Sequence, residues 1–499
     1  MPTFFSTQSR RGRGILQTFR GETRAAARLH PLEKALLIVV SVHLCFLPWA
    51  LGTMHVWSQS ISLGFAGLEI VLALINRNYT EDHSNEGSFK LVMWPKLIRF
   101  PIFWVGLALL LYITTQALNP SWEFVTDGRM RWMQPIAHIT WLPTGMRTPF
   151  KDMNAWRMMM IYGAPWLLMW SLWVGVTRRT TIQTILTVVV INAALFALIG
   201  ILQKVAGNGK ILWLIPHVRI KTFFATILYK NHAGAFLNLA LAASAAIAWT
   251  LHQRAKRALS RGTAAPLFVF CGVVVAFAVR MTESRAALML MMAFTLFVVG
   301  LSAIAHLTNQ HKTENSWQLT ATILLLGTFC VGGAYFLKFG DSIENIGNLL
   351  DRDRTNSILH RQTAAVATLE MATDKIATGW GAGSFRHFFP AYQQHHPSIY
   401  KPWGETLRWE YAHNDYLQVL AELGIVGALI LALGLASAVI ILLKHKFYKH
   451  PNVVILMVGL VLTMAHCWID FQSYNPAVLC HWCLLGVVAI KWLQLDPQH

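Results

Sequence analysis

The sequence from residue 412 to residue 443 reads AHNDYLQVLAELGIVGALILALGLASAVIILL. Its last 21 residues, 423–443, contain no charged side chain. A helix of about 20 apolar residues is as long as the hydrocarbon core of a membrane is thick. The polar residues at the start of the stretch would then lie where the helix leaves the membrane. The stretch therefore predicts a membrane-spanning helix over 415–443 with a polar N-terminal end.

The composition extends this prediction to the whole chain. Apolar residues make up 55% of the 499 residues and charged residues only 13%, whereas a soluble domain carries about 25% charged residues. Eleven further apolar runs have spanning length, namely 35–52, 57–76, 98–117, 156–176, 181–206, 230–252, 264–280, 284–306, 318–338, 452–470 and 474–494. We therefore expect an all-α, polytopic membrane protein of about 12 transmembrane helices.

Positive charge in the short connections sets the orientation of such a protein. Segment 1–34 is basic and lacks the cleavage site of a signal peptide, so we expect it in the cytoplasm. Every second connection after it is also basic, namely 77–97, 178–179, 254–261 and 444–449. Four regions follow, which are the basic N-terminal segment 1–34, helices 1–9 over 35–338, a large outer loop over 339–414, and helices 10–12 with a short cytoplasmic tail over 415–499.

The outer connections are also rich in cations, although cations are usually kept off that side. Arg280 and Arg285 flank a very short connection, and Arg219 and Arg361 lie in longer ones. Guanidinium groups bind phosphate and pyrophosphate bidentately, so an anionic substrate on the outer side would explain these residues. For most of the outer cations a solvated loop charge is the simpler interpretation, but we do not favour it for Arg280 and Arg285.

The polar start of the quoted stretch carries the strongest local signal for chemistry. His413 is predicted at the membrane surface, and Asn414 and Asp415 can cap the helix that follows. Glu422 lies two helical turns after Asp415, inside the apolar run, where a carboxylate needs a partner and indicates function. His413 is either a general base or an ordinary interfacial histidine, and its spacing alone does not separate the two.

Four further segments have polar or glycine-rich patterns at expected helix ends or in the outer loop. They are Tyr229-Lys230-Asn231-His232-Ala233-Gly234, Glu283-Ser284-Arg285-Ala286, Gly379-Trp380-Gly381-Ala382-Gly383-Ser384-Phe385 and Asp470-Phe471. Upstream of the glycines, residues 358–377 have the apolar spacing of a helix that lies on the membrane surface. Together with the H-N-D-Y-L and E-L-G elements of the quoted stretch, this order resembles the O-antigen ligase and polymerase superfamily of bacterial envelope glycosyltransferases.

The resemblance implies a GT-C type fold in the bacterial inner membrane, with the active site on the periplasmic side and the large loop between helices 9 and 10 in the periplasm. Such enzymes transfer a glycan from an undecaprenyl pyrophosphate carrier to an acceptor hydroxyl. The acceptor is lipid A-core for ligases and a growing glycan for polymerases. The resemblance implies no metal or other cofactor, and membrane lipids rather than nucleic acid as surroundings.

The residue types suit this reaction. The leaving pyrophosphate needs its charge matched, and the attacking hydroxyl needs a base, for which imidazole is suited near neutral pH. The expected catalytic residues are His413 as base, Arg285 for the pyrophosphate, and Glu422 and Asp415 as orienting carboxylates. The expected substrate-binding residues are Lys230, Asn231, His232, Arg280, Arg219, Arg361 and Tyr416. The family often has arginine where Lys230 stands, so either Lys230 or Arg219 would supply that contact.

Other functions stay open at this point. The motifs do not separate a ligase from a polymerase of polysaccharide. A transporter of lipid-linked glycans would also have about twelve spans, but transporters tend to show internal repeats and broken helices at the midplane. His43 and Glu69 lie nearest the midplane, where we expect His43 to be a packing residue and Glu69 to pair with a basic loop residue. Cys480 and Cys483 form a C-x-x-C inside an apolar run and are expected to act as small apolar residues.

Overall fold

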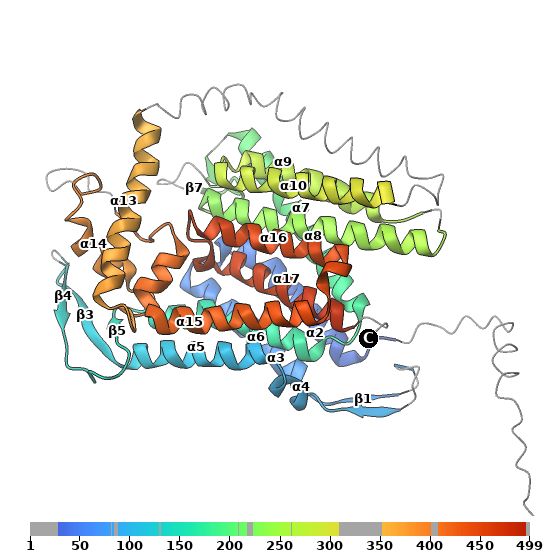
Figure 1. Cartoon of the computed structure of the whole chain (residues 1–499), viewed down its shortest axis with the longest axis horizontal. Helices are drawn as coiled ribbons and strands as arrows, with labels where there is room; N and C mark the ends of the chain where they lie inside the picture. Colours follow the sequence, from blue (N-terminus) through green and yellow to red (C-terminus); the bar gives the residue numbers. More distant parts are fainter. Residues whose placement is uncertain are drawn as a thin grey trace, which may run out of the picture.

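Most of the described chain is helical, and the helices lie where apolar runs predicted them (Figure 1). The computed structural model describes residues 28–80, 82–83, 88–128, 131–207, 209–216, 223–260, 262–308, 352–400 and 408–495. Eleven helices coincide with predicted spans, namely α2 (Pro31–Trp49), α3 (Val56–Leu74), α5 (Pro101–Leu118), α6 (Ala155–Gly175), α7 (Arg179–Ala206), α8 (Lys230–Arg257), α9 (Ala265–Met281), α10 (Arg285–Thr308), α15 (Asp415–Lys444), α16 (Pro451–Cys467) and α17 (Pro476–Gln494).

The length and composition of these helices indicate a polytopic membrane protein. Within the described residues, nine helices are long and apolar enough to cross a membrane, while α9 and α16 are shorter apolar helices. The predicted span 318–338 lies outside the described residues. The total of twelve transmembrane helices therefore stays a prediction.

Burial divides the helices into a centre and a rim. In α17 83% of the most apolar window is buried inside the protein, and in α8 72%. In α15 only 11% of that window is buried, and in α5 and α10 22%. A helix that is apolar on all sides but mostly uncovered by protein needs an apolar solvent, so the outward faces of α5, α10 and α15 indicate contact with lipid.

The described residues are mostly helical, as expected of an all-α protein, but three small sheets join the helices. They are β1 (Arg77–Tyr79) with β2 (Phe89–Leu91), β4 (Arg131–Pro135) with β3 (Pro120–Thr126) and β5 (Gly145–Arg147), and β6 (Lys210–Ile211) with β7 (Ile215–Pro216). In β3 the alternate side chains Trp122 and Phe124 pack on Phe388 and His387. This period of two is the strand signal, and it is too short to stand out among the apolar runs.

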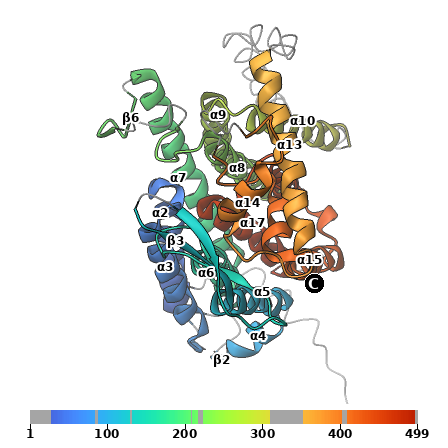
Figure 2. The ribbon, with the colours of Figure 1, turned by 90° about the vertical axis from the view of Figure 1, so that its left-hand side faces the viewer.

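One end of the bundle is covered by the segments of the predicted outer loop. Helix α13 (Arg352–Asp374) runs across the ends of the bundle helices, and α14 (Phe385–Gln393) and the sheet of β3–β5 lie beside it (Figures 1 and 2). The surface helix predicted over 358–377 is thus confirmed as a helix. Residues 339–351 and 401–407 of the same predicted loop lie outside the described residues. The short helix α4 (Trp94–Ile98) lies far from this end, near β1 and β2.

Helix α15 is not continuous, which the sequence did not predict. Gly424 has φ 64° and ψ −171°, a conformation outside the helical region. The backbone groups freed there pair with residues 376–381, because Ile425 N donates to Ile376 O at 2.8 Å and Gly381 N donates to Glu422 O at 2.9 Å. A buried backbone group must find such a partner when the helix does not supply it. The break therefore ties the glycine-rich segment to the N-terminal part of α15.

The buried ionisable groups near the middle of α2 and α3 pair with each other. Nδ1 of His43 lies 2.8 Å from Glu69 Oε1, and Nε2 of the same ring lies 2.8 Å from Ser62 Oγ. The expectation that Glu69 pairs with a basic loop residue is therefore wrong, since its partner lies on the neighbouring helix. The interpretation of His43 as a packing residue agrees with these contacts.

Candidate active site

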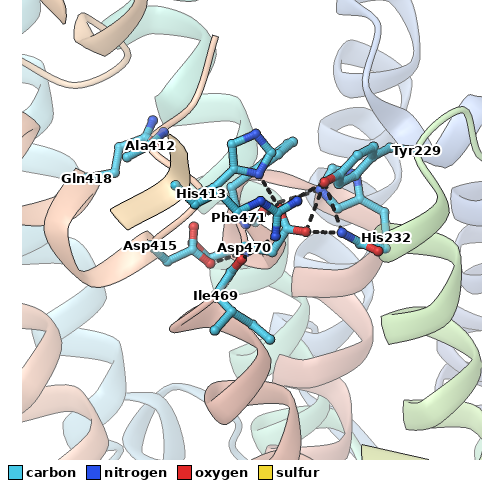
Figure 3. A network of polar contacts seen from close by, with 12 residues as sticks. Tyr229, His232, Ala412, His413, Asp415, Gln418, Ile469, Asp470 and Phe471 are labelled. Atoms are coloured by element: carbon cyan, nitrogen blue, oxygen red, sulfur yellow. Dashed lines mark hydrogen bonds and ion pairs between the residues drawn. The ribbon is translucent and has the colours of Figure 1, made fainter. Parts of the chain in front are cut away.

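Three segments that are far apart in the sequence meet at the end of the bundle that α13 covers (Figure 3). They are the start of α8, the start of α15, and the connection between α16 and α17. The first contributes Tyr229 and Asn231, the second His413, and the third Asp470. Each of these side chains stands at a helix end or in a connection, where the backbone leaves room for a polar group to face outward.

The pair of His413 and Asp470 is the centre of this site. Nδ1 of His413 lies 3.0 Å from Asp470 Oδ1. The His413 side chain is 23% exposed, whereas that of Asp470 is 1% exposed. His413 has φ 52°, a left-handed conformation that is uncommon for a residue with a Cβ and is found where structure holds it in place. The next residue, Asn414, caps α15 by accepting a hydrogen bond from Leu417 N at 3.1 Å.

Asp470 is held by further donors. The Tyr229 hydroxyl donates to both of its oxygens, at 2.9 and 3.2 Å, and the Asn231 amide donates to Oδ2. The backbone N–H of Phe471 donates to Oδ1 at 3.0 Å. A buried carboxylate with this many donors is stabilised in its charged form.

The electrostatics agree with this arrangement. Burial alone would raise the pKa of Asp470, but the hydrogen bond and charge of His413 and the charge of Arg361 outweigh burial and hold that pKa well below its usual range. Burial and the nearby Asp470 charge raise the pKa of Tyr229, so its hydroxyl keeps the proton that it donates. Asp470 is therefore an anion at neutral pH.

An anionic Asp470 fixes the proton of the histidine. Because the carboxylate accepts a hydrogen bond from Nδ1, the neutral His413 ring carries its hydrogen on Nδ1 and has its lone pair on Nε2. The same carboxylate stabilises the imidazolium that forms when Nε2 takes up a proton. The pair can therefore act as a general base for a hydroxyl that approaches Nε2.

Among the expected cations, Arg361 has a hydrogen bond directly beside this pair. It is half-buried in α13, and its Nη1 donates to the backbone oxygen of Ile469 at 3.0 Å, one residue from Asp470. Lys230 is half-buried at the first position of α8, directly before Asn231. Within the described residues the Lys230 side chain forms no hydrogen bond or ion pair. Both side chains can therefore contribute positive charge beside His413.

The remaining expected cations are Arg285, Arg280 and Arg219. Arg285 is exposed at the first position of α10, and the start of that helix packs on α8, where Asn238 Nδ2 donates to Ala287 O at 2.9 Å. Arg280 is half-buried in the last turn of α9. Arg219 lies outside the described residues. No described contact joins Arg285 or Arg280 to the pair of His413 and Asp470.

Glu422 supports the glycine-rich segment instead of facing the reaction centre. Its carboxylate accepts from the backbone N–H groups of Gly383 at 2.9 Å and Phe385 at 3.1 Å, and from Tyr474 OH at 2.9 Å. Gln418 supplies a fourth contact at 3.2 Å. With 1% exposure, Glu422 is placed to position the loop rather than to exchange protons with a substrate.

The other expected residues also act through neighbours. Asp415 Oδ2 accepts from Ser473 N at 2.8 Å, which joins α15 to the connection that holds Asp470. His232 is buried, with Nε2 3.2 Å from Phe471 O and Nδ1 3.2 Å from Asn475 Nδ2. Tyr416 is exposed and donates to Met464 O at 2.8 Å. These contacts hold the three converging segments together.

Sequence reasoning missed two members of the site. Asp470 and Tyr229 belong to the D-F and Y-K-N-H-A-G segments, but the sequence predicts no role for either. The partners of Asp470 lie 57 residues away at His413 and 241 residues away at Tyr229, and spacing in the chain does not reveal such a meeting. Aromatic packing adds to it, since Tyr229 and Tyr411 both stack on Phe471, with ring centroids 5.0 and 4.1 Å apart.

Among the residues that the structure describes, no three His, Cys, Asp or Glu side chains lie close enough together to hold a metal ion. Cys480 and Cys483 are buried free thiols on α17, in keeping with the interpretation as small apolar residues.

Comparison with known proteins bears on the same region. No curated protein matches the chain. The family model described as O-antigen ligase matches residues 270–432, which include α10, α13, the glycine-rich segment and His413 at the start of α15. The resemblance to the O-antigen ligase and polymerase superfamily that the motifs predict is thereby confirmed by a family match over residues 270–432.

Proposed function

We propose that this protein is a glycosyltransferase of the bacterial inner membrane. It moves a glycan from an undecaprenyl pyrophosphate carrier to an acceptor hydroxyl on the periplasmic face, in the manner of an O-antigen ligase. The observation that carries the proposal is the pair of His413 and Asp470, 3.0 Å apart, at the covered end of a bundle of apolar helices. The match to the O-antigen ligase family model supports the reaction class.

In the proposed reaction His413 Nε2 accepts the proton of the acceptor hydroxyl. The freed oxygen attacks the anomeric carbon of the donor glycan and forms the new glycosidic bond. The bond from that carbon to the pyrophosphate oxygen breaks, and the carrier leaves as an anion that keeps the bonding electrons. Asp470 stabilises the resulting imidazolium of His413, which later returns its proton to water.

The leaving pyrophosphate needs positive charge more than it needs an acid. Arg361 is the first candidate, because it lies beside the pair and its guanidinium can bind two phosphate oxygens. Lys230 is the second, as a point charge at the start of α8. Arg285, at the start of α10, is the third candidate.

The acceptor decides between a ligase and a polymerase. The shared geometry serves both, since either acceptor presents a sugar hydroxyl to His413. We place the ligase first and keep a polymerase of the same superfamily as the alternative. The transporter is less well supported, because His43 binds both Glu69 and Ser62 on the neighbouring helix inside the bundle.

A chromosomal His413→Ala allele tests the proposal. Loss of the base should lower transfer by at least about 100-fold, so surface polysaccharide should disappear while membrane levels of the protein stay normal. His395→Ala is the matched control, because His395 is an exposed histidine of the same covering segment. Lipid-linked chains of full length that accumulate in the mutant indicate a ligase, and single repeat units indicate a polymerase. Normal polysaccharide in His413→Ala would contradict the proposed site.

A further inference from the structure

An apolar groove lies on the outward side of α6, apart from the pair of His413 and Asp470. Its volume is about 580 Å³, and α3, α5 and α6 contribute Leu63, Leu110 and Met159 respectively. Gly163 forms part of its floor, and Phe150 and Trp156 line one end. Every side chain that lines it is apolar.

The helices around the groove face lipid. Leu68 on α3 is 46% exposed and Leu111 on α5 is 58% exposed, and both helices qualify as membrane spans. A groove that opens sideways between such helices is reached from the hydrocarbon of the membrane, where a hydrocarbon chain is the available occupant.

One end of the groove lies at the same end of the bundle as the candidate active site. Phe150 and Trp156 flank the start of α6, and both are exposed, as aromatic side chains are at a membrane interface. Lys151 and Arg147 are exposed beside them, next to the half-buried Asp152 and to Glu123, whose carboxylate lies 3.8 Å from Arg147. The two exposed cations can contact the anionic groups of a lipid head group above the apolar groove.

The groove and the site share a wall. Leu110 and Met159 pack against the buried cluster that contains Tyr411, Phe471 and Tyr474, and Phe471 is the ring that lies under His413 with centroids 5.0 Å apart. In both overall views α3 and α5 lie on one side of α17, and α8 and α10 lie on the other (Figures 1 and 2). Lys230 and Arg285, which suit the pyrophosphate, therefore belong to the side away from the groove.

We infer that the groove holds an acyl chain of the lipid-anchored acceptor, so that acceptor and donor reach His413 from opposite sides of α17. This inference rests on the proposed function, in which both substrates are lipid-anchored and only one carries a pyrophosphate. The donor is assigned to the side with Lys230 and Arg285, and the acceptor to the side with the groove.

Filling the groove tests the inference. A Cβ built on Gly163 meets only Leu63 Cδ1, at 3.7 Å, so Gly163→Leu places its side chain in the groove without a backbone clash. Gly67→Leu is the matched control, because Gly67 lies on α3 outside the groove and a Cβ there meets nothing within 4 Å. We expect Gly163→Leu to raise the KM for lipid A-core acceptor about tenfold. This is the factor expected when the new side chain displaces about two methylene groups of the acyl chain from their apolar surroundings. The KM for the polyprenyl donor and the rate with a deacylated core oligosaccharide should not change.

Photo-crosslinking decides the question without turnover. Lipid A-core with a diazirine in an acyl chain should label Met159 or Met160 in the wild type, and a polyprenyl diphosphate or phospholipid probe should label them much less. The inference would be overturned if the polyprenyl diphosphate probe or the phospholipid probe labelled these methionines more than the lipid A-core probe did. Equal acceptor KM values for Gly163→Leu and Gly67→Leu would overturn it as well. If the wild type transfers no glycan at all, the proposed function fails, and labelling still decides what the groove binds.

Discussion

Asp470 has four hydrogen-bond donors around one carboxylate, and they come from three separate segments. Replacing it with Asn keeps the shape but puts an amide N–H where a lone pair is needed. The His413 ring then loses the acceptor that fixes its hydrogen on Nδ1. We expect Asp470→Asn to lower the rate of glycan transfer by about 10³-fold or more, as for other histidine bases that lose their carboxylate. The measurement is the initial rate of the purified protein in nanodiscs.

Tyr229→Phe provides the control at the same site. It removes the hydroxyl that donates to Asp470 at 2.9 Å but leaves the charge of the carboxylate and its contact to His413. The loss should be about tenfold, the typical cost of one unsatisfied buried acceptor. If Asp470→Asn were no slower than Tyr229→Phe, the carboxylate would not be orienting the base.

At the scale of single elements, α15 depends on a glycine that its apolar pattern hides. Gly424 has a backbone conformation available only to glycine, and a Cβ there would lie 2.4 Å from the backbone oxygen of Ala377. Gly424→Ala should therefore destabilise the fold by about 3 kcal/mol or more, seen as a lower unfolding midpoint in detergent. Gly300→Ala on α10 is the control, because a Cβ there meets nothing within 4 Å and alanine favours a helix. A Gly424→Ala protein as stable as the control would show that the break is dispensable.

The break also marks how far the sequence could predict this molecule. Long apolar runs predict helices well, because one residue type repeated over a span leaves few alternatives. His413 could be singled out because it directly precedes such a run. The pairing of residues 376–381 with the α15 break, and of Asp470 with His413, joins segments tens of residues apart. Local periodicity carries no information on these contacts, so neither the broken helix nor the partner of the base was predicted.

At the scale of the whole molecule, the position of the site depends on which end of the bundle faces the periplasm. α8 starts beside the site at Lys230 and ends at Arg257. Its 28 residues extend about 42 Å, longer than the roughly 30 Å hydrocarbon core. Arg254, Lys256 and Arg257 lie at its far end, and the positive-inside rule predicts that this end faces the cytoplasm. The covered end with α13 and the sheet of β3–β5 should then lie in the periplasm.

Cysteine labelling in intact cells tests this orientation. Trp141, near β5 at the covered end, is 80% exposed, and Leu259, just beyond α8, is 89% exposed. A membrane-impermeant maleimide should label Trp141→Cys in intact cells and Leu259→Cys only after permeabilisation. The unmodified protein gives the background labelling of the native cysteines, of which Cys45 and Cys467 are half-buried and Cys271, Cys480 and Cys483 are buried. The reverse pattern would put His413 in the cytoplasm, where a periplasmic acceptor could not reach it, and the proposed transfer reaction would have to be abandoned along with the orientation.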